Sequence, residues 1–346
     1  MSVSMTVGVL TGGGDCPGLN PAIRGLVYRG LDHGFRFLGL SDGWKGLVKG
    51  LTTPLGLEQV EDIHNKGGTI LGTSRTNPFK SEEGVQSCLD NWKLLGLDAL
   101  VAMGGEDTLG VATRLSGEHG LQVVGVPKTM DNDLSATDFT FGFDTSVTVA
   151  VDAAERLVDT GRSHRRVMVL EVMGRHAGWV ALYTGIASGA DWTLLPEDEN
   201  PDYDAMCAHL SKVHARKRVA LVVASEGITL PGAGEGEEEL DEFGHMILKT
   251  RGVAEQLTAY IEEKTGIETR SAVIGHIQRG GSPTLFDRML GMRVGACAAD
   301  LVAEGKWGQM AALKGNDVVG VPLAEATGQL KTVPSAWIDF VRIFSK

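Results

Sequence analysis

The sequence predicts an α/β protein in which parallel β-sheets are covered on both faces by helices. Short apolar runs recur along the chain, and nearly every one ends in glycine beside a charged or polar residue. Segments of helical character lie between these runs, and a strand followed by a helix, repeated, is the pattern of a parallel sheet. The length of 346 residues favours two domains over one.

Six apolar runs are expected to be buried strands, each of which places a polar cluster at its carboxyl end. They are residues 7–10, 99–103, 123–126, 167–172, 219–224 and 272–274. Helices are expected at residues 84–95, 108–119, 145–161 and 247–264, and in the segment that begins at Pro21. The acidic, glycine-rich stretch 232–239 is expected to be a solvated loop. Ligands bind at the carboxyl ends of strands in open parallel sheets, so the polar clusters are candidate site residues.

Composition excludes several functional classes. The formal charge is 32 − 44 = −12 and the aromatic content is 6%, which argues against a nucleic-acid partner. The N-terminus has no cationic segment before an apolar core, and no apolar run has membrane-spanning length, so we expect a cytoplasmic protein without a membrane partner. The four cysteines are widely spaced, which fits structural thiols in a reducing compartment better than a zinc site.

The densest chemistry lies in the sequence PKTMDND at residues 127–133, directly after the apolar run 121–126. One turn there holds an ammonium (Lys128), a hydroxyl (Thr129) and two carboxylates (Asp131 and Asp133). A purely structural loop seldom needs so many functional groups. The segment is therefore the first candidate for a reactive site.

Two glycine-rich loops are candidate phosphate sites. The loop GGGDCPGLN at residues 12–20 lacks the Gly-Lys-Ser/Thr ending of a Walker A loop, but consecutive glycines before a helix let backbone N–H groups approach an anion. The alternative is a plain tight turn. The loop at residues 67–75 adds hydroxyls and Arg75, whose guanidinium suits a planar anion with several oxygens; the alternative is a solvent-facing arginine.

Arginine and histidine accumulate near the later strands, which is notable in an acidic protein. Cations gathered at strand ends indicate anion pockets. Together with carboxylates that can bind Mg²⁺ or accept a proton, they indicate phosphoryl transfer. The cations are Arg165, Arg166, Arg175, His176, Arg270, His276 and Arg279, and the carboxylates are Glu106, Asp131 and Asp133.

Seven motifs, in order, make the chain resemble the 6-phosphofructokinases over nearly its whole length. The resemblance is strongest to the pyrophosphate-dependent, actinobacterial-type branch of the phosphofructokinase A family. The motifs are GGGDCPGLN at 12–20, GTSRTNP at 72–78, GGEDT at 104–108, PKTMDND at 127–133, MGRHAGW at 173–179, SEG at 225–227 and GHIQRGG at 275–281.

The resemblance implies two Rossmann-like, three-layer domains with mostly parallel sheets and an active site in the cleft between them. The phosphoryl-donor domain would comprise residues 1–142 plus about 278–326, and the fructose 6-phosphate domain residues 143–277 plus about 327–346. The implied reaction is a reversible, Mg²⁺-dependent transfer from pyrophosphate to the 1-hydroxyl of fructose 6-phosphate.

The resemblance also assigns catalytic roles. Asp131 matches the catalytic base, and Arg175 would stabilise the transferring phosphoryl group. Thr129 would help to hold the sugar, and Lys128 would neutralise the phosphate that remains when pyrophosphate is split. Asp133 and Glu106 would bind the metal, although Glu106 stands where relatives generally carry aspartate.

Substrate binding is implied on both sides of the cleft. Donor contacts are expected from Gly13, Gly14, Arg75, Asp107, Thr108 and Lys128, and sugar-phosphate contacts from Thr129, Asp131, Arg166, Met173, Gly174, Arg175, Glu226, Arg270, His276 and Arg279. Arg166 and Arg270 match residues that reach the site from a neighbouring subunit. A homodimer or homotetramer with shared active sites is therefore expected.

Asp107 is the residue that favours pyrophosphate over ATP. Relatives that use ATP generally carry glycine at this position, and a carboxylate here would oppose the nucleotide's α-phosphate by volume and by charge. Two alternative functions stand beside this one. They are an ATP-dependent enzyme of the same family and a non-catalytic sugar-phosphate sensor, although a sensor has no need of a base beside the donor pocket.

Overall fold

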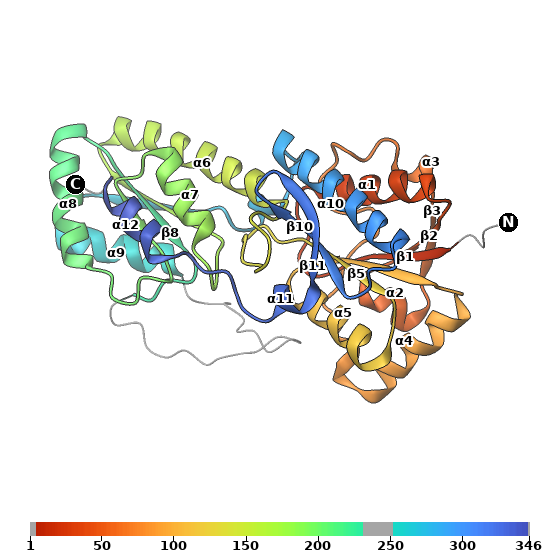
Figure 1. Ribbon diagram of the computed structural model, residues 1–346. Coiled ribbons are helices and arrows are strands. Elements are labelled where there is room, and N and C mark those ends of the chain that lie inside the picture. The colour runs from red at the N-terminus through yellow and green to blue at the C-terminus, as the bar shows by residue number, and fades with distance from the viewer. Residues whose placement is uncertain (1–4, 231–251, 345–346) are drawn as a thin grey trace.

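The computed structural model describes residues 5–230 and 252–344, which form two sheets with helices on both faces (Figure 1). The larger sheet has seven strands in the order β11-β10-β5-β4-β1-β2-β3. Its strands are β1 (Thr6–Thr11), β2 (Arg36–Leu40), β3 (Thr52–Leu55), β4 (Ala99–Gly104), β5 (Val123–Pro127), β10 (Gln309–Lys314) and β11 (Asp317–Pro322). All pairs are parallel except the two at the edges, β2 with β3 and β10 with β11.

The smaller sheet has four parallel strands in the order β7-β8-β6-β9. Its strands are β6 (Val167–Val172), β7 (Trp192–Leu194), β8 (Ala220–Ser225) and β9 (Thr269–Val273). Both sheets are therefore mostly parallel, and the α/β architecture expected from the sequence is confirmed.

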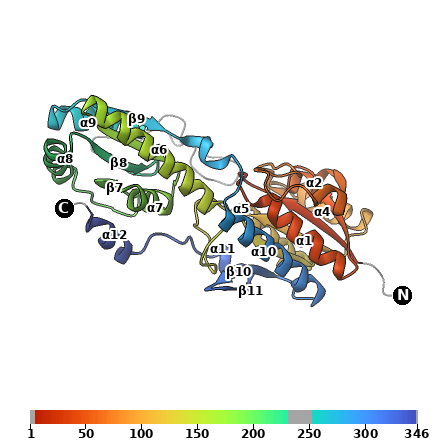
Figure 2. The same ribbon diagram turned by 90° about the horizontal axis from the view of Figure 1, so that it is seen from above.

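Helices make each sheet the middle of three layers, as the two perpendicular views show (Figures 1 and 2). On the larger sheet, α1 (Leu19–Asp32), α3 (Leu57–Val60) and α10 (Leu285–Ala303) lie on one face; α2 (Trp44–Lys49), α4 (Glu82–Leu94), α5 (Glu106–His119) and α11 (Leu323–Thr327) lie on the other. On the smaller sheet, α6 (Phe143–His164) and α7 (Trp179–Ser188) oppose α8 (Tyr203–Lys217) and α9 (Val253–Thr265). The last helix, α12 (Ser335–Arg342), packs on α7, and short 3-10 helices lie at η1 (Pro78–Lys80) and η2 (Gly275–Arg279).

The alternation of side chains along β4 builds the core on both faces of the larger sheet. Val101 and Met103 join the cluster beneath α1 and α10, whereas Leu100 and Ala102 join the cluster beneath α5. All six residues of this strand are buried, as a central strand covered on both faces requires.

The structure confirms all six predicted strands, within a few residues at their ends. The predicted helices correspond to α4, α5, α6 and α9, and the one expected from Pro21 is α1. The loop predicted at 232–239 and the part of the predicted helix 247–264 before residue 252 lie outside the described residues. In the described ranges, no helix is long and apolar enough to cross a membrane.

Five strands were not predicted, namely β2, β3, β7, β10 and β11. The edge strand β11 is exposed or half-exposed along its length, so it lacks an apolar run. The strand β3 is exposed at three of its four positions, and β7 has only three residues. β3, β7 and β11 are therefore defined by their pairing with a neighbouring strand, which the sequence pattern does not show.

Helices α1 and α10 pack closely because each carries a glycine where they meet. A Cβ atom on Gly295 of α10 would lie 2.1 Å from the carbonyl oxygen of Ala22, and one on Gly25 of α1 would lie 2.2 Å from that of Met292. Real atoms do not approach so closely, so a larger residue at either position must push the helices apart.

Substitution Gly295→Ala is therefore expected to destabilise the protein by about 1–3 kcal/mol, because it separates α1 from α10. The control is Gly117→Ala in α5, where an added Cβ meets nothing within 4 Å. That change is expected to stabilise the helix by up to about 1 kcal/mol. Thermal unfolding of both variants measures the difference, and a midpoint for Gly295→Ala at or above the wild-type value contradicts the close packing.

Candidate active site

One cavity gathers the polar residues at the carboxyl ends of strands from both sheets. The strands β1, β4 and β5 contribute from the larger sheet, and β6 and β8 from the smaller one. Its lining contains most of the predicted site residues: Gly13, Gly14, Arg75, Glu106, Asp107, Thr108, Lys128, Thr129, Asp131, Asp133, Met173, Arg175, Glu226 and Arg279. Segments far apart in the sequence thus converge on a single site.

The reactive turn after β5 is held by its own backbone and hydroxyl groups. Lys128 N–H donates to the Gly104 carbonyl at 2.9 Å, which continues the pairing of β4 with β5. Thr140 Oγ1 donates to the Thr129 carbonyl at 2.7 Å, and Asp131 N–H donates to Thr129 Oγ1 at 3.1 Å. Asn132, between the two carboxylates, has a left-handed backbone with φ of 54°, a conformation that asparagine tolerates better than most residues.

Asp131 has the properties of a carboxylate base. Burial, followed by the negative charge of Asp133, raises the pKa of Asp131 to about 6, while Arg279, Lys128 and Arg175 oppose that rise. Its Oδ1 atom is buried and has no hydrogen-bond partner among the described residues. A carboxylate with a raised pKa is a stronger base, and at neutral pH it is still mostly deprotonated.

Asp133 and Glu106 form the acidic side of the cavity. Burial is the main cause that raises the pKa of Asp133, the charge of Glu106 adds to it, and a hydrogen bond from Thr129 lowers it. The described residues contain no group of three or more His, Cys, Asp or Glu able to hold a metal. Mg²⁺ is commonly bound by one or two carboxylates together with substrate phosphates and waters, so these two carboxylates fit a site completed by a phosphate ligand.

Lys128 places a buried ammonium opposite these carboxylates. The residue is 4% exposed, and its Nζ donates to the Gly14 carbonyl. Burial lowers the pKa of Lys128, and the nearby Asp131 and Asp133 counteract this by favouring the charged form. An ammonium in this position attracts an anion bound beside the glycine loop.

Side chains are disfavoured in the glycine loop by the left-handed backbone at Gly13 and by the position of Arg279 beside Gly14. Gly13 has φ of 75°, and a Cβ atom there would lie 3.5 Å from Lys128 Nζ. A Cβ atom on Gly14 would lie 2.2 Å from Arg279 Nη1, and this arginine also donates to the Asp15 carbonyl at 3.2 Å. Two cations from distant segments therefore contact the backbone of the same loop.

The smaller sheet brings Arg175 and Glu226 to the opposite side of the cavity. Glu226 directly follows β8, and its N–H donates to the Val172 carbonyl at 2.9 Å, which joins it to the end of β6. Met173 N–H donates to Gln278 Oε1 at 2.8 Å. Burial and then the charge of Asp131 raise the pKa of Glu226, whereas Arg175 and Arg279 lower it.

Asp107 stands between this cavity and a second hollow. It lies in the first turn of α5 with Glu106, and both residues line both spaces. The second hollow is also lined by Phe79, Gly110 and Arg114, and the Arg114 guanidinium lies 3.6 Å from the centroid of the Phe79 ring. A ligand that extended from the cavity into this hollow would pass the Asp107 carboxylate.

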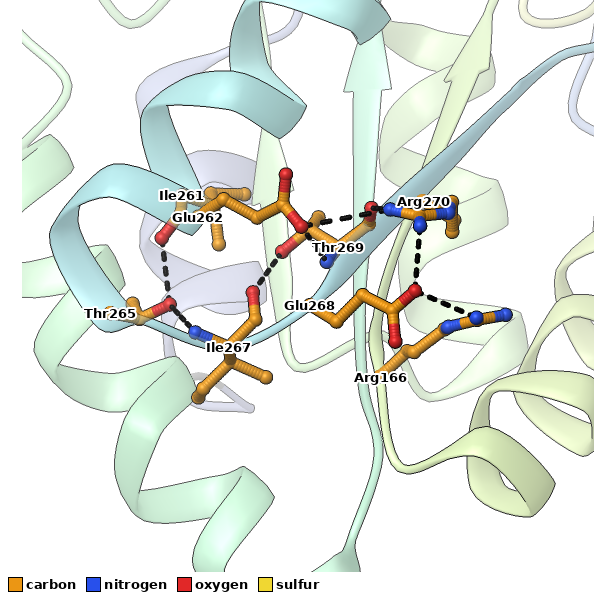
Figure 3. A network of polar contacts seen from close by, with 8 residues as sticks. All are labelled: Arg166, Ile261, Glu262, Thr265, Ile267, Glu268, Thr269 and Arg270. Atoms are coloured by element: carbon orange, nitrogen blue, oxygen red, sulfur yellow. Dashed lines mark hydrogen bonds and ion pairs between the residues drawn. The ribbon is translucent and has the colours of Figure 1, made fainter.

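Three of the cations that the resemblance assigns to the sugar phosphate do not line the cavity of this chain, and neither does Arg165. Arg166 and Arg270 both bind Glu268 Oε1, at 2.7 and 2.6 Å (Figure 3). They lie at the amino ends of β6 and β9, whereas the cavity lies at the carboxyl ends of the strands. His276 is exposed on η2. Gly174 is also absent from the lining, although it directly precedes Arg175.

Five lining residues have no role assigned by the resemblance, namely Gly105, Met130, His176, Ala177 and Leu330, although His176 is one of the cations noted near the strand ends. Four of them lie within motifs that the sequence analysis had singled out. Leu330 does not, since it belongs to a C-terminal segment that carries no motif. Its neighbour Lys331 donates its backbone N–H to the Asp133 carbonyl at 2.8 Å, a contact that only the folded chain displays.

Comparison with known proteins places these motifs in one family. The family model described as Phosphofructokinase matches residues 6–302. The chain is 55% identical to a pyrophosphate--fructose 6-phosphate 1-phosphotransferase of Dictyoglomus thermophilum, with 98% of each chain covered. It is 51% identical to a protein of the same name from Streptomyces coelicolor, with 98% of this chain and 99% of the relative covered.

An ATP-dependent relative is somewhat less similar. ATP-dependent 6-phosphofructokinase 3 of Streptomyces coelicolor is 48% identical over 96% of this chain and 97% of that protein. Among solved structures, a pyrophosphate-dependent phosphofructokinase from Nitrosospira multiformis shares the fold, with a TM-score of 0.83 at 21% identity, and covers 96% of this chain and 86% of that one. The chain therefore belongs to the phosphofructokinase family.

Proposed function

We propose that the protein transfers a phosphoryl group from pyrophosphate to the 1-hydroxyl of fructose 6-phosphate, reversibly and with Mg²⁺. The products are fructose 1,6-bisphosphate and phosphate, a step of glycolysis and gluconeogenesis that we assign to the cytoplasm. The enzyme is thus a diphosphate--fructose-6-phosphate 1-phosphotransferase. The position of Asp107, between the cavity and the second hollow, is the observation that carries the choice of donor.

The donor is held by the larger sheet in this proposal. Pyrophosphate lies against Gly13 and Gly14, with Arg75 and Thr108 as further contacts, and the buried Lys128 ammonium balances the charge of the departing phosphate. The carboxylate of Asp107 repels the α-phosphate that ATP would place beside it. We accordingly assign residues 1–142 and about 278–326, which supply all strands of this sheet, to a donor domain.

Asp131 accepts the proton of the 1-hydroxyl as that oxygen attacks phosphorus. Its raised pKa and its buried, unpartnered Oδ1 support this role. Thr129 orients the sugar, and Arg175 stabilises the charge that develops on the transferring group. Glu106 and Asp133 would hold Mg²⁺, which when bound neutralises negative charge on the phosphate oxygens.

The sugar phosphate is held by residues 143–277 and about 327–346, which we assign to a second domain. Glu226 accepts hydrogen bonds from sugar hydroxyls, Met173 and Gly174 contact the sugar, and Arg279 and His276 bind the 6-phosphate. Arg166 and Arg270 complete that phosphate site from a neighbouring subunit. Arg270 lies on β9, which is an edge strand. Val273, at the end of β9, and Ile277, in η2, are 50% and 70% exposed, as an interface between subunits would require.

The choice of donor is tested by initial rates with pyrophosphate or ATP as the only donor. We expect turnover with pyrophosphate alone. In Asp107→Gly, kcat/KM for ATP should rise at least about tenfold, because the repulsion of the α-phosphate is removed. Asp107→Asn keeps the volume of the side chain and removes its charge, so it shows whether volume or charge excludes ATP. Turnover of the wild-type protein with ATP alone contradicts the proposed donor.

The pH dependence tests Asp131 as the base. Because Asp131 must be deprotonated and its pKa is about 6, kcat/KM should fall as pH decreases through about 6. A sugar phosphate also titrates near this pH, so Glu226→Gln serves as the control. If the fall in kcat/KM at low pH reports Asp131, removal of the Glu226 charge should move that fall to lower pH. If the fall stays at the same pH, it reports the substrate and contradicts Asp131 as the titrating base.

Subunit sharing is tested by mixing two inactive variants, Asp131→Asn and Arg270→Ala. If Arg270 acts across an interface, each mixed dimer contains one intact site, and an equal, randomly mixed sample regains roughly a quarter of wild-type activity. Refolding the two variants together and assaying against separately refolded samples measures this recovery. Native mass spectrometry resolves the mixed oligomer from the two pure ones. If it shows mixed oligomers and activity does not recover, Arg270 acts in the active site of its own subunit.

A further inference from the structure

Lys331 fixes the turn that carries the two carboxylates of the cavity. Its Nζ donates to Asn132 Oδ1 at 3.0 Å, to the Thr137 carbonyl at 3.1 Å and to the Asp138 carbonyl at 2.9 Å. An ammonium has three N–H donors, and all three are used here on one short loop. Hydrogen bonds from a charged donor are stronger than neutral ones.

The backbone around Lys331 contacts the same loop. Lys331 N–H donates to the Asp133 carbonyl at 2.8 Å, and Leu330 pairs with Leu134 in an isolated antiparallel bridge. Ser135 Oγ donates to the Gln329 carbonyl at 2.5 Å. Residues 329–331 therefore run alongside the loop, and Leu330 reaches the cavity itself.

The loop needs such external support. Asn132 and Ala136 both have left-handed backbones, with φ of 54° and 60°. Conformations of this kind are unfavourable for residues with a Cβ atom and persist only where surrounding contacts impose them. Thr140 N–H also donates to Asn132 Oδ1 at 3.2 Å, so this amide oxygen is held from two sides.

Lys331 is also joined to the smaller sheet. Its carbonyl accepts a hydrogen bond of 2.7 Å from Trp179 Nε1, at the start of α7. Two residues later, Val333 N–H donates to Glu197 Oε1 at 2.9 Å, and the same oxygen accepts from Gly178 N–H at 2.9 Å. The segment thus links the loop after β5 to the helix that follows Arg175.

We propose that Lys331 is a positioning residue, which holds the Asp131–Asn132–Asp133 turn in register with the α7 side so that both carboxylates face the bound donor and acceptor. The role rests on the proposed phosphoryl transfer, since it acts through the base and a metal-binding carboxylate. It requires no contact between Lys331 and either substrate. Lys331 affects the reaction only through the hydrogen bonds described above.

Kinetics of Lys331→Met provide the first test. We expect kcat to fall about 10- to 100-fold, because the base and the metal-binding carboxylate lose their orientation. The KM for fructose 6-phosphate should change less than about threefold, since Glu226 and Arg279, which bind the sugar phosphate in this proposal, lie outside the turn. The control is Lys314→Met, which removes an exposed positive charge whose field also reaches Lys331; its kcat should match the wild-type value.

Binding provides a readout that does not depend on turnover. Calorimetry with Mg²⁺ and methylenediphosphonate, a donor analogue that is not cleaved, should show at least about fivefold weaker binding to Lys331→Met than to wild type. This comparison also separates the two proposals. Absence of turnover in the wild-type protein would refute the proposed reaction, whereas the binding difference decides the role of Lys331.

A double-mutant cycle with Asn132→Gly tests the route of the effect, because glycine keeps the left-handed backbone and removes the amide. If Lys331 acts through Asn132, the double variant loses little more kcat than Lys331→Met alone. Thermal unfolding shows whether each variant is folded. If Lys331→Met does not fold, Lys331→Arg replaces it, because arginine keeps the charge but does not place three donors as the ammonium does. An unchanged kcat in a folded variant, or an equal loss in Lys314→Met, overturns the proposal.

Discussion

Buried opposite charges, held close together at the ends of two sheets, are the constraint on which this site depends. Asp131 and Asp133 repel each other within one turn, and Lys128 and Arg279 offset that repulsion from other segments. An isolated carboxylate would be neutral in such a place, because burial disfavours its charged form. The neighbouring cations oppose the effect of burial, so the pKa of Asp131 rises only to about 6, and the Lys128 ammonium is available to bind an anion.

Parallel strands explain how so many distant residues meet. The carboxyl ends of β1, β4 and β5 are adjacent in one sheet, so the glycine loop, the start of α5 and the reactive turn must be neighbours. The strands β6 and β8 do the same for Arg175 and Glu226. Each sheet alone presents half of a site. The cavity forms only because the carboxyl ends of both sheets face each other. The segments that connect the sheets therefore contribute to the site as much as the strands do.

The sequence alone predicted the parts of this architecture that local pattern controls. Buried central strands such as β4 and β6 are continuous apolar runs, and the polar groups at their ends were identified as site residues. The antiparallel edge strand β11 has no comparable pattern, since its residues are largely exposed and its pairing with β10 defines it. The contribution of Leu330 and Lys331 was equally hidden. It arises from a contact between Lys331 Nζ and Asn132 Oδ1, which are 199 positions apart in the sequence. Leu330 and Lys331 themselves belong to no motif.

The same contact shows why the geometry of the site is a property of the whole fold. Lys331 binds the reactive turn through its ammonium and the Trp179 indole through its carbonyl, so one residue connects the structures that carry the base and Arg175. In the proposed function, this C-terminal segment outside both sheets helps to set how Asp131, as the base, lies relative to Arg175, which would stabilise the transferred phosphoryl group. Phosphoryl transfer is sensitive to such distances, because its catalysis depends on positioning and charge more than on covalent chemistry by the protein.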